Sequence, residues 1–215
     1  MSEKEQGTSS PDDLWYPSLI ISLNSRYGQH LLSSSSSSFA YKRLLSHFEP
    51  QQRSDFCGIA SGVILLKRLQ SKYKWIQSNL HATIAPTSKS GGMTLPQLSD
   101  MLEKCDVSSI IRYCHDEKIE EQFRRDMKEA QNLVIVNYWR QYEEGENNEI
   151  QRSGHFSPIG AFHEKTDRVL IMDTYQPHFP HHWVKVKELM RMMRAKDEEE
   201  NAPRGYLIVT DGTVE

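Results

Sequence analysis

The sequence predicts an α+β fold in which a helical half packs against an antiparallel sheet. In roughly the first 130 of the 215 residues, apolar side chains recur every three or four positions, as they do in amphipathic helices. The remainder is richer in short apolar runs that end at turn residues, and the connection 164–168 is typical of a hairpin. Helices followed by strands favour an α+β arrangement over an alternating α/β one.

Length and composition indicate one domain with a modest core. Hydrophobic residues make up 37% of the chain, and the formal net charge is −3. This charge gives no argument for a nucleic-acid partner, and no apolar run is long enough to cross a bilayer. Residues 1–13 lack the basic and apolar regions of a secretory signal. We therefore expect a soluble cytoplasmic protein without a nucleic-acid or membrane partner, and leave export by a non-classical route open.

The N-terminal third is predicted to contain a tail, a domain start and a loop. The polar residues 1–13 are expected to be a disordered tail, and 14–211 a single domain. An extended segment is expected over 14–23, before a turn and a short helix over 24–32. The six serines at 33–38 predict a surface loop, because such a run has no apolar side chain to bury.

Periodicity places the remaining elements. Helices are predicted over 39–48, 57–72, 117–130 and 184–193, and after Thr94, which is a good N-cap residue. Strands are predicted over 107–113, 133–139, 155–163, 169–173 and 205–210. The stretch 81–89 and the charged, glycine-containing segment 140–152 are expected to be loops.

Cys57 stands where a polar run gives way to the predicted central helix. Backbone N–H groups in the first turn of a helix are unpaired, and the helix dipole favours negative charge there. A thiol in that place should ionise more easily, and the thiolate is the nucleophilic form. Gln51 is close enough upstream for its amide to point to the same place. The alternative is a buried structural cysteine.

A nucleophilic cysteine needs a base within reach and a group that orients the base. His155 begins one predicted strand after Ser153 and Gly154, where little bulk covers it, and Asp173 ends the next strand. A short hairpin connection brings the start of one strand beside the end of the other. We therefore expect His155 and Asp173 to be neighbours at one sheet edge. The order Cys, His, acid is that of papain-like enzymes.

Several separate motifs follow one another along the chain. They are YGQHLL at 27–32, FCGIAS at 56–61, GMTL at 92–95, VIVNY at 134–138, GHFSP at 154–158, LIMD at 170–173, WV at 183–184 and RGY at 204–206. Together they resemble the phytochelatin synthases, which are glutathione γ-glutamylcysteinyltransferases of the papain-like superfamily, and especially their short bacterial members. The resemblance runs from about Leu19 to Thr210, and it implies a papain-like fold.

The resemblance also implies roles for six residues. Cys57 would be the nucleophile, His155 the general base and acid, and Asp173 the acid that orients it. Gln51 would donate to the oxyanion, together with the backbone N–H of Cys57. The γ-glutamyl head, with its α-ammonium and α-carboxylate, would be held by Asp197 and Arg204, which carry the matching charges. The residues alone place Asp197 in an acidic surface run, 197–200.

The implied reaction is cleavage of the Cys–Gly bond of glutathione through a γ-glutamylcysteinyl thioester on Cys57. No Cys-rich region like that of the plant and yeast members follows Thr210. We therefore expect mainly hydrolysis to γ-Glu-Cys and glycine, with weak transpeptidation to phytochelatin. Expected partners are glutathione and its metal or S-conjugates, and the sequence leaves a homodimer open. The alternatives are a papain-like peptidase or deconjugase of glutathione S-conjugates, and a non-catalytic module that binds metal–thiol complexes.

No tightly bound cofactor and no dedicated metal site are expected. Cadmium, zinc or copper would enter as glutathione thiolate complexes or as activators. Four histidines have poor spacing for a structural site and are expected at the surface: His163, His178, His181 and His182. Cys105 and Cys114 are expected to be buried thiols, with a soft-metal site as the alternative. Three cysteines are too few for a disulfide framework and fit a reducing compartment.

Overall fold

The computed structural model describes residues 15–69, 74–83, 92–176 and 178–211. The predicted tail over 1–13 and most of the predicted loop 81–89 lie outside these ranges. Within them, the chain forms a seven-stranded sheet in the order β1-β6-β5-β4-β3-β9-β2, with every neighbouring pair antiparallel. The strands are β1 (Ile21–Ser22), β2 (Ile110–Tyr113), β3 (Asn132–Glu144), β4 (Glu149–His163), β5 (Arg168–Ile171), β6 (His182–Lys185) and β9 (Gly205–Thr210). A separate ribbon pairs β7 (Lys196–Asp197) with β8 (Ala202–Pro203).

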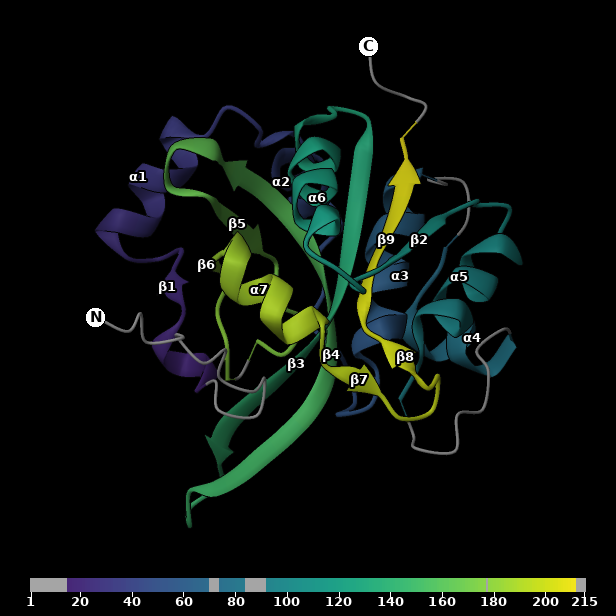
Figure 1. Cartoon of the computed structure of the whole chain (residues 1–215). Helices are drawn as coiled ribbons and strands as arrows, with labels where there is room; N and C mark the ends of the chain where they lie inside the picture. Colours follow the sequence, from purple (N-terminus) through teal and green to yellow (C-terminus); the bar gives the residue numbers. More distant parts are fainter. Residues whose placement is uncertain (1–14, 70–73, 84–91, 177, 212–215) are drawn as a thin grey trace.

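Helices cover both faces of the sheet (Figure 1). The helical elements are η2 (Tyr16–Ser18), α1 (Arg26–Ser34), α2 (Phe39–Leu44), η3 (Leu45–His47), α3 (Cys57–Leu69), α4 (Gln77–Thr83), α5 (Leu95–Glu103), α6 (Lys118–Lys128), η4 (Glu164–Thr166) and α7 (Val186–Met193). The alternation of β3 separates the two cores. Leu133 and Ile135 pack with α3, α4 and α5, whereas Val134 and Val136 pack with α6 and α7. The α+β prediction is confirmed, with helices on both faces rather than one.

Helix α3 is the buried centre of one core. Every residue from Cys57 to Leu66 is buried, so the helix has no solvent-exposed stripe over that length. The predicted start at Cys57 is confirmed. Helix α5 also begins as predicted, because the Thr94 hydroxyl accepts from the backbone N–H of Gln97 and the Gln97 side chain returns a bond to Thr94.

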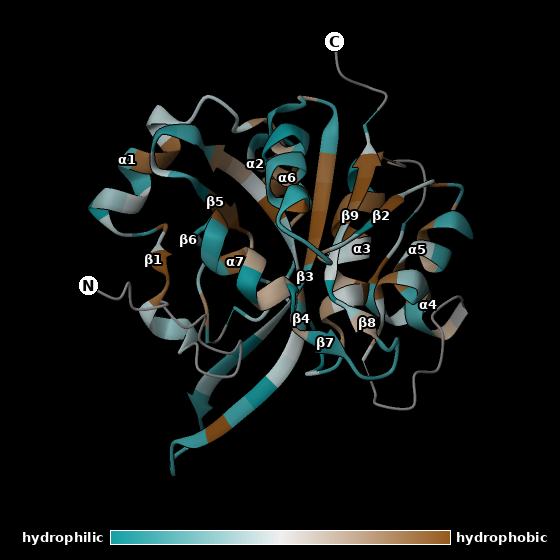
Figure 2. Cartoon of the chain, in the orientation of Figure 1, coloured by the Kyte–Doolittle hydropathy of each residue, from teal (hydrophilic) through white to brown (hydrophobic). Residues whose placement is uncertain are grey.

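The predicted loop over 140–152 is wrong. Strands β3 and β4 continue through it as a two-stranded ribbon whose register runs from Arg140 opposite Ser153 to Glu144 opposite Glu149. Gly145 supplies the positive φ (+79°) that the tip needs. The ribbon projects from the body of the molecule, and its colouring is mostly hydrophilic (Figures 1 and 2). Beyond Tyr142 the residues of the ribbon are exposed or only half-buried, so their sequence does not show the alternation of a half-buried strand.

The serine run is not the free surface loop that composition predicts. Ser33 and Ser34 are the last residues of α1, and their hydroxyls donate to the backbone carbonyl of His30. The carbonyl of Ser37 accepts from the backbone N–H of Phe162 at 2.7 Å. Serine hydroxyls that bond to nearby carbonyls can end a helix and fix the following turn, which low complexity alone does not reveal.

Several short elements also differ from prediction. The stretch 14–23 contains η2 and the two-residue strand β1 rather than one extended strand. The first residues of the predicted loop 81–89 belong to α4, and β6 was not anticipated. In the described part of the chain, no helix combines the length and apolar character that crossing a membrane requires.

Candidate active site

A cleft of about 800 Å³ opens beside the start of α3. Its walls come from the N-terminus of α3, the segment before α5, strands β3 and β4, and the β7–β8 ribbon. The residues that line it include Cys57, Trp139, Gly154, Asp197 and Arg204. Three residues that the sequence placed in one site, Cys57, Asp197 and Arg204, therefore share one cavity although they are far apart in the chain.

Cys57 is the first residue of α3 and is 8% exposed. Burial raises the pKa of its thiol, and the opposing effects are smaller: hydrogen bonds from the backbone of Phe156 and Gly58, and the positive charge of Arg140. The expectation of an easily ionised thiol is therefore wrong for this state, because desolvation outweighs the helix start. The resting site holds a neutral thiol whose sulfur already meets backbone N–H groups.

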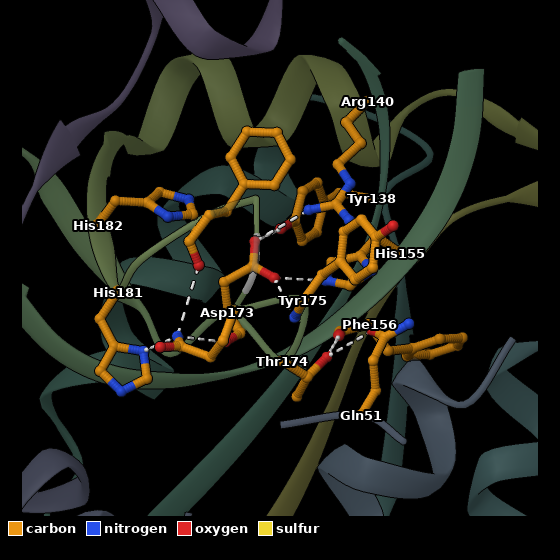
Figure 3. A network of polar contacts seen from close by, with 12 residues as sticks. Gln51, Tyr138, Arg140, His155, Phe156, Asp173, Thr174, Tyr175, His181 and His182 are labelled. Atoms are coloured by element: carbon orange, nitrogen blue, oxygen red, sulfur yellow. Dashed lines mark hydrogen bonds and ion pairs between the residues drawn. The ribbon is translucent and has the colours of Figure 1, made fainter. Parts of the chain in front are cut away.

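His155 and Asp173 are neighbours, as the hairpin predicted. Nε2 of His155 lies 2.9 Å from Oδ1 of Asp173, and both side chains are buried (Figure 3). The details differ, because His155 lies inside β4 opposite Tyr138 rather than at an uncovered strand start, and Asp173 follows the end of β5. Nδ1 of His155 is the ring nitrogen left for another partner.

The thiol and the imidazole are close in the fold without a direct bond. Phe156, whose backbone reaches the Cys57 sulfur, is the residue after His155 in β4. Among the hydrogen bonds of the described residues, none joins the Cys57 side chain to His155. Catalytic hydrogen bonds are often long in structures without substrate and shorten when it binds.

The buried surroundings keep the imidazole neutral. Burial and, after it, the charge of Arg140 lower the pKa of His155 to about 4, although the charge of Asp173 and its hydrogen bond act in the opposite direction. Burial by itself would raise the pKa of Asp173, but the neighbouring His155 and Arg140 hold it well below its usual range. At neutral pH the site therefore contains an ionised carboxylate beside an uncharged imidazole that can accept a proton.

Gln51 lies near this group but points elsewhere. Its Nε2 donates to the backbone carbonyls of Arg53 at 2.9 Å and Ser54 at 3.0 Å. Its Oε1 accepts from the Thr174 hydroxyl at 3.2 Å, and its backbone N–H donates to the Thr174 carbonyl at 2.8 Å (Figure 3). In this conformation both amide hydrogens are already used within the loop before α3, so the structure does not direct them at the thiol.

Asp197 and Arg204 form a buried ion pair on the cleft wall. Nη1 of Arg204 lies 2.8 Å from Oδ2 of Asp197 and 2.9 Å from Oδ1 of Asn137. Asp197 and Arg204 are each 8% exposed, so Asp197 is not part of a solvated acidic surface. The alternation of the β7–β8 ribbon explains this, because Asp197 faces inward while its neighbour Glu198 is exposed.

Two residues of β3 that the sequence did not assign belong to the site. Arg140 falls in the segment that was expected to be a loop, yet its buried Nη1 donates to Oδ2 of Asp173 at 2.9 Å. Trp139 faces the other way and lines the cleft, with the Arg204 guanidinium 5.6 Å from its ring. Side chains alternate between the two faces along β3, which could have shown that Trp139 and Arg140 point to opposite sides. The strand was expected to end at Trp139, so this alternation was not applied to Arg140.

The expectation of surface histidines is wrong for His163 and His182, which are buried. Nδ1 of His182 meets the Pro180 carbonyl at 2.7 Å, and Nδ1 of His163 meets the Thr166 hydroxyl at 2.8 Å. Cys105 and Cys114 are buried thiols, as expected. Within the described ranges, no three His, Cys, Asp or Glu side chains are grouped so that they could hold a metal ion.

The chain is thus an α+β protein in which a cysteine at a helix start lies close in the fold to a buried histidine–aspartate pair. A family model for phytochelatin synthase matches residues 12–206, and the chain therefore belongs to the phytochelatin synthase family.

The chain is similar to proteins named glutathione gamma-glutamylcysteinyltransferase. It is 26% identical over 184 residues to glutathione gamma-glutamylcysteinyltransferase 3 of Lotus japonicus, and the aligned region covers 78% of this chain and 37% of the relative. It is 24% identical over 178 residues to protein 1 of Arabidopsis thaliana, covering 78% and 36%. The Schizosaccharomyces pombe protein is 24% identical over 182 residues, covering 79% and 43%. The chain thus spans well under half the length of these relatives.

Proposed function

We propose that this chain is a papain-like cysteine enzyme that cleaves the amide bond between the cysteine and the glycine of glutathione. One observation carries the proposal: the Cys57 thiol opens on the same cleft as the buried pair of Asp197 and Arg204. A nucleophile and a receptor for a zwitterionic head group therefore stand in one cavity. The names of the related proteins support glutathione as the molecule that fills it.

The γ-glutamyl head matches the charged pair. Its α-carboxylate would take hydrogen bonds from Arg204, and its α-ammonium would face Asp197. Nε of Arg204 is buried and has no hydrogen-bond partner among the described residues, so the guanidinium keeps a donor for a ligand. With the head held there, the side chain of the γ-glutamyl group would lead the peptide toward Cys57.

The first half of the reaction forms a thioester. The neutral His155 accepts the proton of Cys57, and the sulfur attacks the carbonyl carbon of the Cys–Gly amide. The carbon–nitrogen bond then breaks, and the imidazolium returns its proton to the amine of the departing glycine. Asp173 holds the imidazole through Nε2 and stabilises its charged form.

The second half releases the product. Water gives a proton to His155 and attacks the thioester, so that γ-Glu-Cys leaves and Cys57 recovers its proton. The amine of a second glutathione can take the place of water and yield a phytochelatin, and we propose hydrolysis as the main outcome. Metal ions would arrive as thiolate complexes of glutathione, because the substrate itself carries a soft sulfur ligand.

We propose the backbone N–H of Cys57 and the amide of Gln51 as donors to the oxyanion. Removing one such donor costs about 10²–10³-fold in kcat in enzymes of this kind. Because Nε2 of Gln51 now bonds two carbonyls of its own loop, its role requires that substrate binding turns the amide away from the carbonyl of Arg53 or Ser54.

Product analysis with purified protein tests the proposal. Incubation with glutathione, with and without Cd²⁺ or Zn²⁺, should release equal amounts of glycine and γ-Glu-Cys, which mass spectrometry resolves from longer oligomers. The variant Cys57→Ser should keep the fold and release no glycine. Cys105→Ser is the matched control, since it removes another buried thiol that does not line the cleft.

The competing functions give different results. A deconjugase would release glycine from glutathione S-conjugates and leave free glutathione intact. A binding module would leave both intact, while metal–glutathione complexes would still raise the melting temperature of the protein. Glycine release by Cys57→Ser would remove the assigned nucleophile.

A further inference from the structure

The guanidinium of Arg140 is enclosed by aromatic rings. Its side chain is 2% exposed, and Cζ lies 4.7–5.8 Å from the centroids of four rings. The rings belong to Tyr16, Tyr142, Tyr175 and Phe179, which come from η2, the β3–β4 ribbon and the segment after Asp173. Aromatic faces stabilise a buried cation, and their attraction grows when water is excluded. Parts of the chain that are distant in sequence thus contribute to one enclosure.

Only one acidic group in the described part of the chain meets this cation at salt-bridge distance. Nη1 of Arg140 lies 2.9 Å from Oδ2 of Asp173, while Nε is buried and bonds none of the described residues. A guanidinium in this position is costly to desolvate unless its charge is compensated. The aromatic enclosure therefore keeps the positive charge of Arg140 next to the carboxylate of Asp173, which orients His155.

Asp173 is saturated with donors. Oδ1 lies 2.9 Å from Nε2 of His155 and takes the backbone N–H of Tyr175 at 2.8 Å. Oδ2 accepts a hydrogen bond from Nη1 of Arg140 and another, at 3.4 Å, from the hydroxyl of Tyr138. Figure 3 shows the carboxylate between the imidazole and the guanidinium. With both oxygens bonded, the carboxylate cannot turn, and Oδ1 remains directed at the imidazole.

The charges around the imidazole come from several elements. The titratable and charged groups nearby are Cys57 on α3, Tyr16 on η2, Tyr138, Arg140 and Tyr142 on β3, Asp173 and Tyr175 after β5, and His181 and His182 at β6. Among them only Asp173 and Arg140 carry full charges at neutral pH, and these charges oppose each other. The imidazole therefore faces a neutralised pair, not a free carboxylate.

We propose that Arg140 is a positioning residue that neutralises Asp173, so that His155 stays an uncharged, correctly turned imidazole in the resting enzyme. Arg140 acts through Asp173 and does not line the cleft. The chemical step assigned to His155 rests on the function proposed above. There, an uncharged imidazole can accept the proton of Cys57, whereas an imidazolium paired to a bare carboxylate could not.

Nuclear magnetic resonance of ¹⁵N-labelled histidine tests the charge role without any substrate. The signal of His155 is assigned with His155→Gln, and its titration midpoint is measured in the wild type, Arg140→Met and Arg140→Lys. Removing the cation should raise the midpoint by about 1 pH unit or more, because the carboxylate is then uncompensated. Arg140→Lys keeps the charge and should leave the midpoint within about half a unit of the wild type.

Two further variants keep this test decisive. If Arg140→Met does not fold, Arg140→Gln keeps a hydrogen-bond donor at this position without the charge. The titration midpoint of His155 should rise in that variant as well. Arg125→Gln removes a 61%-exposed arginine on α6 and should leave the midpoint unchanged. An unchanged midpoint in a folded Arg140→Met or Arg140→Gln variant would overturn the proposal.

Kinetics then connect the charge role with the reaction. In Arg140→Met, kcat for glycine release should fall by about 10²-fold, as for loss of a general base, while KM changes little. Arg140→Lys should recover part of kcat. If the wild type does not cleave glutathione, the proposed function fails, and the titration midpoint still decides the role of Arg140.

Discussion

Arg204 occupies the space that a side chain on Gly154 would need. A Cβ built on Gly154 would lie 2.3 Å from Nη1 and 2.6 Å from Cζ of Arg204. The guanidinium rests against this bare stretch of β4 while it bonds Asp197. The glycine before His155 thus lets the proposed substrate-head cation pack directly against the strand that carries the proposed base.

The first prediction concerns this contact. Gly154→Ala should push the guanidinium away from the cleft wall and weaken binding of the γ-glutamyl carboxylate. Loss of a hydrogen bond to a charged group costs about 1.5–3 kcal/mol, so we expect KM for glutathione to rise roughly 10- to 100-fold. Steady-state kinetics of glycine release measure this effect.

Gly92→Ala is the matched control for that change. Gly92 also lines the cleft, but a Cβ there meets no atom within 4 Å. Its KM should stay close to that of the wild type. A wild-type KM in Gly154→Ala would show that Arg204 can shift without loss of substrate binding.

The second prediction separates the two charges of the head group. Asp197 should bind the α-ammonium, so the wild type should prefer glutathione to glutaryl-Cys-Gly, which lacks that group. In Asp197→Asn the preference in kcat/KM should shrink by about 10-fold or more, because the lost interaction belongs to one substrate only.

Glu198→Gln provides the comparison, since Glu198 follows Asp197 on the same cleft wall but is exposed. It should keep the wild-type preference between the two peptides. Equal loss of activity toward both peptides in Asp197→Asn would instead indicate that Asp197 only supports Arg204.

Patterns in the sequence predicted the buried elements well. Helix α3, the N-cap of α5 and the strand β9 carry strong apolar periodicity or cap chemistry, and each begins where predicted. The two-stranded ribbon beyond Tyr142 was not predicted because its residues are exposed or only half-buried, so they carry no apolar alternation. Strand β6 escaped it because prolines and histidines precede Trp183 in an otherwise turn-like stretch.

Some residue pairs of the site were also predicted from the sequence, and others were not. Hairpin geometry was sufficient to pair His155 with Asp173, because sequence spacing fixes which strands are neighbours. The pairing of Asp197 with Arg204 came from the family resemblance, since burial of one residue in an acidic run has no local signal. The partner of Asp173 on its other side, Arg140, depended on a strand that was expected to end one residue earlier.

The third prediction concerns stability at acid pH. The pKa of His155 is lowered to about 4 in the folded chain, against an ordinary value of 6.5. Between these values the unfolded state binds more protons, so stability should fall as pH drops from 6.5 to 4. For this single group the loss is roughly 3 kcal/mol. Urea unfolding at several pH values measures it.

The histidines next to the site complicate this measurement and supply its control. Burial also lowers the pKa of His181 to about 4, so the wild-type slope contains more than one group. His155→Gln should flatten part of the slope, and His181→Gln should flatten a separate part of it. An unchanged slope in His155→Gln would mean that His155 is not held neutral by the fold.

The fourth prediction distinguishes two roles for Gln51. If its amide only ties the loop before α3, Gln51→Ala should lower the melting temperature and leave the kcat of the folded fraction intact. If the amide turns to the oxyanion, kcat should fall about 10²-fold or more while KM and stability change little. The exposed neighbour Gln52, changed to Ala, controls for effects of loop composition. Glycine release and thermal melting, measured on the same preparations, separate the two outcomes, and a wild-type kcat in Gln51→Ala would leave the backbone N–H of Cys57 as the proposed donor.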